Sequence, residues 1–322
     1  MGKNEGLTEV TIWYRGVIEG RLARRIGNCL ADAARSEGEY VQAFDNYVDL
    51  PDRVNVPCRF YARVSGQPIA EPYLYENYTP SVVITTDAAL VKGCNVLKGI
   101  VNGSTLLVNT KRSPEFVLGL VEGLPEVARL KRVATVDAGV AHEYRVPYGG
   151  VEGASEKAVS LKSAAIILGA LNQVNQLVRW ESLNKLEPDE ESLMFGARTV
   201  ASLVAPGFKP GVDDEVAAEP HTYRGKVNLV VPAPSPDGVQ PGFITGNFRL
   251  ERPVIDEKRC TRCRICWSAC PDACITLGGQ SGEEISFNLE YCKGCGICWY
   301  ICPSKAISAE DELDHDGGMV RV

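Results

Sequence analysis

The chain has 322 residues, of which 45% are hydrophobic and 23% charged, and its formal net charge is −7. These values are ordinary for a globular protein long enough to form two domains, and the negative charge argues against nucleic acid or an anionic membrane surface as the main partner. No apolar run reaches the roughly 20 residues that span a bilayer. The first residues also lack the apolar run of a secretory signal. We therefore expect a cytoplasmic protein.

Strand and helix signals alternate over residues 10–204. The apolar runs typical of buried strands are residues 10–14, 81–86, 104–110 and 132–138. The helix signals are an amphipathic stretch at 21–34, the cap–proline–acid start Ser113-Pro114-Glu115, and a stretch at 156–178 that is apolar nearly all round in its middle. This alternation predicts an α/β domain with a largely parallel sheet.

Residues 205–250 have a different composition, rich in proline, glycine and acidic residues. The segment is longer than an ordinary loop, and its composition is typical of a linker. We predict a linker that wraps over a surface, such as that of another subunit. Plain disorder is the alternative interpretation.

Nine of the twelve cysteines lie between Cys260 and Cys302, and their spacing is a repeat. Each half reads C-x2-C-x2-C-x3-C followed by proline, and the halves are offset by 32 residues at every cysteine. The offset extends beyond the cysteines, since Trp267 corresponds to Trp299. The pattern indicates a duplicated unit. Its two sets are Cys260, Cys263, Cys266 and Cys270, then Cys292, Cys295, Cys298 and Cys302.

The spacing is typical of a protein that binds two 4Fe–4S clusters. A cubane cluster takes four thiolates, and three cysteines at x2 spacing supply three of them from one turn of chain. In this motif the fourth cysteine of each half ligates the other cluster. One cluster is therefore predicted to bind Cys260, Cys263, Cys266 and Cys302. The second is predicted to bind Cys292, Cys295, Cys298 and Cys270.

Other roles for clustered cysteines fit the pattern less well. Disulfides are disfavoured without a secretory signal. Zinc sites commonly use two C-x2-C pairs roughly 12–20 residues apart, which does not explain two sets of three plus a Cys-Pro. The ninth cysteine, Cys274, corresponds to Ala306, so we expect a small packed residue there rather than a ligand. We expect Cys29, Cys58 and Cys94 to be packing residues too.

The order of an α/β domain, a linker and a two-cluster ferredoxin module resembles the gamma and delta subunits of the 2-oxoacid:ferredoxin oxidoreductases, fused into one chain. The cysteine motif is shared by many redox proteins, whereas several other stretches resemble this family specifically. These stretches are "PDR" (51–53) with Pro57, "ARVSGQPI" (62–69), "LVNTKRSPE" (107–115), "VATVDA" (133–138) and "TGNFRLERPVID" (245–256).

The resemblance implies a gamma-type α/β domain over residues 1–204, a linker over 205–250 and a bacterial-type α+β two-cluster ferredoxin domain over 251–322. It implies that electrons come from thiamine diphosphate, held with Mg in partner alpha and beta subunits, and pass through the two clusters to an external ferredoxin. No catalytic residue is expected in this chain, whose only histidines are the scattered His142, His221 and His315. Neither nucleic acid nor a membrane is expected as a partner.

One turn departs from the family pattern. The family begins its first strand–turn–helix with a glycine-rich G-R-G-G-Q-G, whose backbone N–H groups can approach an anion. The corresponding stretch here is "RGVIEG" (15–20), in which the β-branched Val17 and Ile18 block that approach. Glu19 places a negative charge where a phosphate would sit, and "VN" (54–55) replaces a second arginine and a glycine. Most members use coenzyme A, and we predict that this chain does not bind it at the turn.

Oxalate is the substrate that fits this departure. Its cleavage can give two carbon dioxides and two electrons, which leaves no acyl group for coenzyme A. We therefore predict coenzyme-A-independent oxalate oxidation, with the turn and the 147–153 loop filling the vacated pocket. One alternative is a pyruvate or other 2-oxoacid:ferredoxin oxidoreductase that uses coenzyme A. Another is a self-contained nucleotide-dependent oxidoreductase, but the required G-x-G-x-x-G is absent from residues 16–20 and 148–153.

Overall fold

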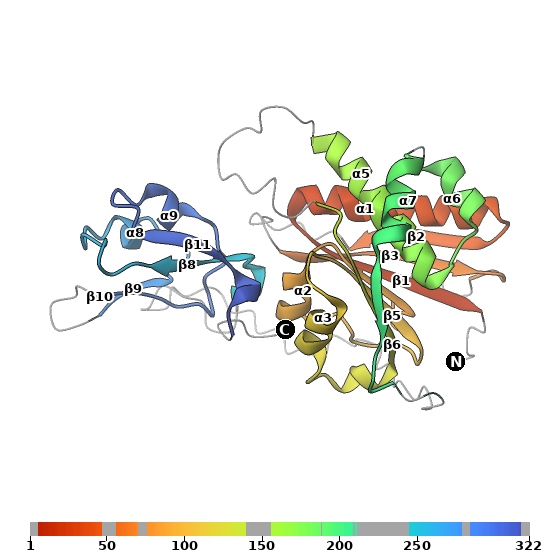
Figure 1. Ribbon diagram of the computed structural model, residues 1–322, viewed down its shortest axis with the longest axis horizontal. Helices are drawn as coiled ribbons and strands as arrows, with labels where there is room; N and C mark the ends of the chain where they lie inside the picture. The colour runs from red at the N-terminus through yellow and green to blue at the C-terminus, as the bar shows by residue number, and fades with distance from the viewer. Residues whose placement is uncertain are drawn as a thin grey trace, which may run out of the picture. The chain divides into compact units, whose positions relative to one another are not determined.

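The structure is a computed structural model. It describes residues 6–46, 56–69, 76–139, 156–187, 189–208, 210, 245–278 and 284–316. The chain divides into two compact units, the first comprising most of residues 1–218 and the second most of residues 219–322. Figure 1 shows the elements of each unit. Within the described ranges, none of the helices combines the length and apolar character needed to cross a bilayer.

A seven-stranded sheet in the order β2-β3-β1-β4-β5-β6-β7 forms the centre of the first unit. The strands are β1 (Leu7–Arg15), β2 (Tyr40–Asn46), β3 (Pro57–Ser65), β4 (Val82–Thr85), β5 (Ser104–Asn109), β6 (Leu130–Val136) and β7 (Ala201–Val204). The pairs β1–β4, β4–β5 and β5–β6 are parallel, and the flanking pairs are antiparallel. The predicted α/β domain with a largely parallel sheet is confirmed.

The flanking strands β2, β3 and β7 have no counterpart in the sequence-based prediction. Every residue of β2 is half-buried or exposed, and β7 has only four residues, three of them exposed. Such strands lack the continuous apolar run that marks the buried parallel strands. Their formation depends on pairing with neighbours that are distant in sequence.

Helices cover both faces of the sheet (Figure 1). On one face lie α1 (Gly16–Ser36), α5 (Glu156–Asn175), α6 (Trp180–Leu186) and α7 (Glu190–Thr199). On the other lie α2 (Ala88–Gly93) and α3 (Pro114–Val121), followed by a 3-10 turn at Pro125–Arg129. The α3 helix begins as predicted, because the Ser113 hydroxyl accepts a hydrogen bond from the Phe116 N–H and Pro114 is the first helical residue.

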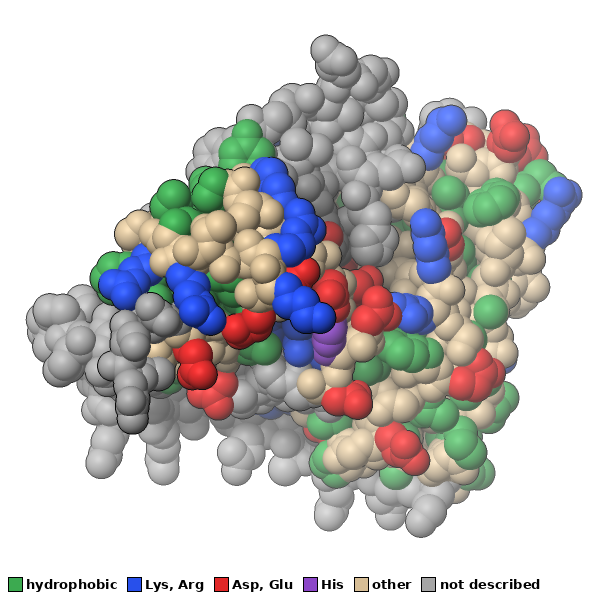
Figure 2. Space-filling view, turned by 60° about the vertical axis from the view of Figure 1, so that its left-hand side comes forward, with side chains coloured by type: hydrophobic (Ala, Val, Ile, Leu, Met, Phe, Trp, Pro, Cys, Tyr) green, Lys and Arg blue, Asp and Glu red, His purple; other side chains and the backbone are tan. Residues whose placement is uncertain are grey.

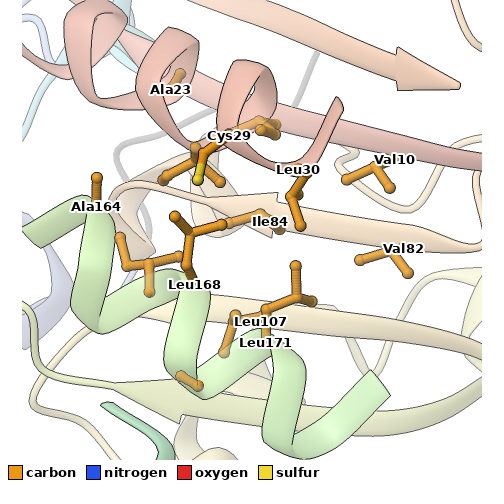
Figure 3. Close-up of a cluster of buried hydrophobic side chains, with 14 of the residues drawn as sticks. Val10, Ala23, Cys29, Leu30, Val82, Ile84, Leu107, Ala164, Leu168 and Leu171 are labelled. Carbon is orange, nitrogen blue, oxygen red and sulfur yellow. The ribbon is translucent and has the colours of Figure 1, made fainter. Parts of the chain in front are cut away.

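Aliphatic side chains from the sheet, α1 and α5 form the core on the α1 face. Figure 3 labels ten of them: Val10, Val82, Ile84 and Leu107 from strands, Ala23, Cys29 and Leu30 from α1, and Ala164, Leu168 and Leu171 from α5. Burial raises the pKa of the Cys29 thiol to about 11. At neutral pH Cys29 is therefore an uncharged packing residue, as the sequence predicts.

Two glycines let α5 and α7 cross with their backbones in contact. A Cβ atom added at Gly169 would lie 1.9 Å from the Leu193 carbonyl oxygen. One added at Gly196 would lie 1.9 Å from the Ile166 carbonyl oxygen. Because no side chain fits in these gaps, glycine at both positions sets the distance between the two helices.

The second unit repeats one small motif twice. Strand β8 (Glu251–Ile255) pairs with β11 (Ile307–Asp311), and β9 (Ile275–Gly278) pairs with β10 (Glu284–Phe287), both antiparallel. Helices α8 (Ile265–Ser268) and α9 (Ile297–Ile301) each begin inside a cysteine motif. Two 3-10 turns complete the unit, Gly246–Phe248 and Glu312–Asp314. The sequence duplication is thus also a structural one, with α8 and β9 equivalent to α9 and β11.

Candidate metal centre

Two cavities lined by cysteines lie in the second unit. The lining of one includes Cys270, Cys292, Cys295 and Cys298. The lining of the other includes Cys260, Cys263, Cys266 and Cys302. Each cavity therefore collects three cysteines of one motif and the last cysteine of the other. We call them the second-motif cavity and the first-motif cavity.

Left-handed backbone positions turn each motif around its cavity. Arg262 and Arg264 have φ angles of 57° and 62°, and the equivalent residues of the second motif, Gly294 and Gly296, have φ angles of 69° and 89°. This conformation is strained for non-glycine residues, at about 1–3 kcal/mol each, and is free of that strain for glycine. The first loop therefore holds arginines in a conformation that the second loop reaches with glycine.

The last cysteine of each motif accepts a backbone hydrogen bond. The Cys274 N–H donates to Cys270 Sγ at 3.3 Å, and the equivalent Ala306 N–H donates to Cys302 Sγ at 3.3 Å. Such bonds stabilise negative charge on sulfur. The Cys274 thiol itself is buried, donates to the Asp272 carbonyl and also borders the second-motif cavity. Its packed position agrees with the prediction from Ala306.

The buried thiols of these cavities are suited to bind a positively charged metal cluster. Burial raises the pKa of the Cys298 thiol to about 12, and it also raises the pKa of Cys266, Cys292 and Cys295. Metal ligation requires thiolates, so a bound metal cluster would supply the positive charge that stabilises these four sulfurs in the charged form. Soft thiolate sets of this kind suit iron–sulfur clusters. Within the described ranges, no three His, Cys, Asp or Glu side chains converge as ligands of a single metal ion would.

The two motif loops differ in exposure. Residues 261–265 are all exposed, whereas residues 291–299 are buried or half-buried throughout. Four basic residues and two acidic ones lie within residues 256–265. We call the exposed basic residues of this stretch the basic loop: Lys258, Arg259, Arg262 and Arg264. Lysine and arginine side chains are prominent on the surface of the second unit in Figure 2.

A buried ion-pair network lies in the same unit. The Glu312 carboxylate accepts hydrogen bonds from the guanidinium groups of Arg249, at 2.6 and 3.1 Å, and Arg252, at 3.0 and 2.5 Å. Burial alone would raise the pKa of Glu312, but these bonds outweigh it and hold the pKa at about 2. The sequence analysis missed this network because Glu312 lies some 60 residues from both arginines.

In the first unit, the carboxyl group of Glu19 lies at the start of α1. Glu19 is buried, and its Oε2 accepts hydrogen bonds from the Arg15 N–H at 3.0 Å and the Thr86 hydroxyl at 2.6 Å. Burial and the nearby Asp87 raise the pKa of Glu19 to about 7. The carboxylate thus takes up the N–H at a helix start, where external anions commonly bind. The side chains of Val17 and Ile18, residues 54–55 and the 147–153 loop lie outside the described residues.

The Asn109 side chain, at the carboxyl end of β5, also forms hydrogen bonds within the protein. Asn109 donates through Nδ2 to the Thr86 carbonyl at 3.0 Å and accepts the Ala138 N–H at 2.8 Å. It therefore ties together the segments that follow β4 and β6. Ligands of open α/β sheets bind outside the carboxyl ends of the strands. Here polar groups at that edge already bind one another.

Two family models match the chain. Residues 23–186 match "Pyruvate ferredoxin/flavodoxin oxidoreductase", and residues 252–306 match "4Fe-4S dicluster domain". The pyruvate/ketoisovalerate oxidoreductases common subunit gamma of Thermococcus kodakarensis is 32% identical over 192 residues, which are 56% of this chain and 97% of that relative. The ketoisovalerate oxidoreductase subunit VorD of Pyrococcus horikoshii is 44% identical over 43 residues, 13% of this chain and 41% of that relative.

Among solved structures, the pyruvate oxidoreductase subunit PORC of Thermotoga maritima is similar to part of this chain. Its identity to this chain is 22%, and the TM-score is 0.43. The matched region covers 61% of this chain and 98% of that one.

Proposed function

This chain belongs to the pyruvate ferredoxin/flavodoxin oxidoreductase family as a gamma-type electron-transfer subunit with a 4Fe–4S dicluster domain, and from this premise we propose its place in a complex. Partner alpha and beta subunits hold thiamine diphosphate and Mg and cleave a 2-oxoacid. This chain provides the gamma and delta parts in one polypeptide, contributes no catalytic residue, and conducts electrons to an external ferredoxin in the cytoplasm.

The two cysteine-lined cavities, each with three cysteines of one motif and the last cysteine of the other, carry this proposal. We assign one 4Fe–4S cluster to Cys260, Cys263, Cys266 and Cys302. We assign the other to Cys292, Cys295, Cys298 and Cys270. When bound, each cluster accepts and releases one electron at a time. The crossed sharing of ligands ties the two halves together, because each motif completes the site of the other.

The basic loop supports an acidic electron carrier as the acceptor. Thr261, Cys263 and Arg264 line the first-motif cavity and are exposed. Complementary charge raises encounter rates by about 10–10³-fold. We therefore propose that electrons leave this chain from the first-motif cluster, and that the better buried second-motif cluster lies earlier in the path.

The contacts of Glu19 and Asn109 support oxalate as the substrate. Both side chains bind the protein itself at the edge where an α/β domain would receive an anionic ligand. Oxalate needs no coenzyme A, because one oxalate dianion yields two carbon dioxides and two electrons. Two one-electron transfers through the clusters then balance the reaction.

Pyruvate oxidation is the second candidate. The similarity to the Thermococcus kodakarensis gamma subunit, named for pyruvate and ketoisovalerate, favours it. In that reaction an acyl group remains after decarboxylation, and coenzyme A carries it away. The partner subunits would then bind coenzyme A without help from the α1 turn.

One assay separates the two candidates. The purified native complex receives oxalate or pyruvate, each with and without coenzyme A, and reduction of viologen or ferredoxin is followed. Oxalate turnover that is indifferent to coenzyme A supports the proposal. Pyruvate turnover that requires coenzyme A, with no oxalate turnover, refutes the oxalate assignment and leaves the electron-transfer role intact. Dehydrogenase activity of this chain alone with a nicotinamide nucleotide would overturn that role as well.

A further inference from the structure

Arg249 joins the buried ion-pair network to the second cysteine motif. Its side chain is 0% exposed, and the Nε and Nη2 groups bind Glu312. The remaining nitrogen, Nη1, donates to the Leu289 carbonyl at 2.7 Å and to the Cys292 carbonyl at 2.6 Å. A buried positive charge is therefore hydrogen-bonded to the backbone of the first cysteine in the motif.

The motif loop closes tightly over the Arg249 side chain. A Cβ atom added at Gly294 would lie 2.8 Å from Arg249 Cγ and 2.6 Å from the Glu251 carbonyl oxygen. On the approach to the loop, the Gly246 N–H donates to the Glu290 carbonyl at 2.7 Å. The segment that carries Arg249 thus holds residues 289–294 from one side through backbone contacts.

The network belongs to only one half of the duplication. At the repeat offset of 32 residues, Ser281 corresponds to Arg249 and Gln280 corresponds to Glu312. These counterparts are uncharged, so the first motif has no equivalent pair in the sequence. A difference between the two clusters can therefore originate here.

From this geometry we propose that Arg249, held in place by Glu312 and Arg252, is a positioning residue that fixes the Cys292 loop and raises the reduction potential of the second-motif cluster. Reduction adds one negative charge to the cluster, and a fixed positive charge in a buried site stabilises the reduced form more than the oxidised form. Arg249 brings a positive charge to the Cys292 carbonyl, and the single negative charge of its partner Glu312 is shared with Arg252. The inference rests on the proposed function only in assigning a 4Fe–4S cluster to that cavity.

The test is a redox titration of the purified complex with dithionite, followed by EPR, in the absence of a 2-oxoacid. Cys295→Ala first identifies the signal of the second-motif cluster. Arg249→Gln removes the charge, and Arg249→Lys keeps it without the forked hydrogen bonding. Arg198→Gln removes an exposed charge from α7 of the first unit as a matched control.

We expect Arg249→Gln to shift the equilibrium for electron sharing between the two clusters at least tenfold toward the first-motif cluster, which corresponds to about 59 mV for one electron. Arg249→Lys retains most of the parental equilibrium, and Arg198→Gln matches the parent. If Arg249→Gln loses the second-motif cluster, the lysine variant decides, because it must then keep both the iron content and the parental potential.

Three results would overturn the inference. They are equal potential shifts in both clusters, no shift in Arg249→Gln with full iron content, and a lysine variant that behaves like the glutamine variant. None of them affects the 2-oxoacid assay described above. Conversely, a parental complex without iron and sulfide in this chain contradicts the proposed function, before any variant is compared.

Discussion

Replacing Glu19 by glutamine tests whether the Glu19 side chain is a buried, ionisable carboxyl group at the start of α1. Both hydrogen bonds to Glu19 end on the same oxygen, Oε2, so the glutamine Oε1 can accept both of them. The substitution removes the ionisable group and keeps its shape. The only change that we expect is the loss of a pH-dependent term in stability.

The magnitude follows from the pKa of Glu19. Burial and Asp87 raise that pKa from 4.5 to about 7, so the folded chain binds the proton more tightly than the unfolded chain does. Stability is therefore lost as the pH rises from about 4.5 to 7 and is constant above that window. At about 1.4 kcal/mol for each unit of pKa, the loss is about 3 kcal/mol. Glu19→Gln does not lose this stability, because the glutamine side chain does not ionise.

Hydrogen exchange of the backbone amides in β1 and α1, read by mass spectrometry, measures this effect as local opening. We expect the variant to exchange only a few-fold more slowly than the parent at pH 5, and up to about 100-fold more slowly at pH 8. Glu115→Gln, at the exposed start of α3, is the matched control, because the hydrogen bond with Ser113 lowers the pKa of Glu115. A variant-to-parent ratio that stays the same at pH 5 and pH 8 would refute the buried carboxylate.

Three further predictions concern the clusters, the acceptor and the helix layer. Cys270→Ala is expected to remove the second-motif cluster and leave the first-motif cluster in place, whereas Cys274→Ala is expected to keep both. Iron analysis and EPR measure the cluster content of each variant. Selective loss of the first-motif cluster in Cys270→Ala would contradict crossed ligation. Arg262→Glu is expected to raise the KM for an acidic carrier about tenfold in low salt and to leave viologen reduction unchanged. The control Arg198→Glu is expected to alter neither. Steady-state kinetics with each acceptor measure both effects. Gly196→Ala is expected to lower the free energy of unfolding by about 1–3 kcal/mol, because the backbone clash with α5 exceeds the gain in helix propensity; a thermal transition at or above that of the parent would show that the crossing can adjust.

The cysteine groupings could be predicted because their information is local. Three cysteines of each set lie within seven residues, and the two-cluster motif predicts that the fourth comes from the other half. The parallel strands were predictable for a similar reason, since β4, β5 and β6 are runs of apolar residues that must be buried on both faces. The start of α3 carried its own cap and proline.

Contacts between distant residues could not be predicted in the same way. The sequence places a negative charge at Glu19, but only the fold brings Thr86 against it and raises its pKa. From the sequence alone, Arg249 would be expected to be a charged surface residue. The structure shows that its guanidinium group binds Glu312 and the Cys292 carbonyl. The edge strands likewise depend on partners, because their own residues are too polar or too few to indicate a buried strand.

The most direct test of the central claim is rapid-freeze EPR of the native complex after mixing with its 2-oxoacid. If this chain conducts the electrons, the signals of its two reduced clusters appear before any external acceptor is reduced, and they decay when oxidised ferredoxin is added. Acceptor reduction at the full steady-state rate while both clusters of this chain stay oxidised would contradict the account.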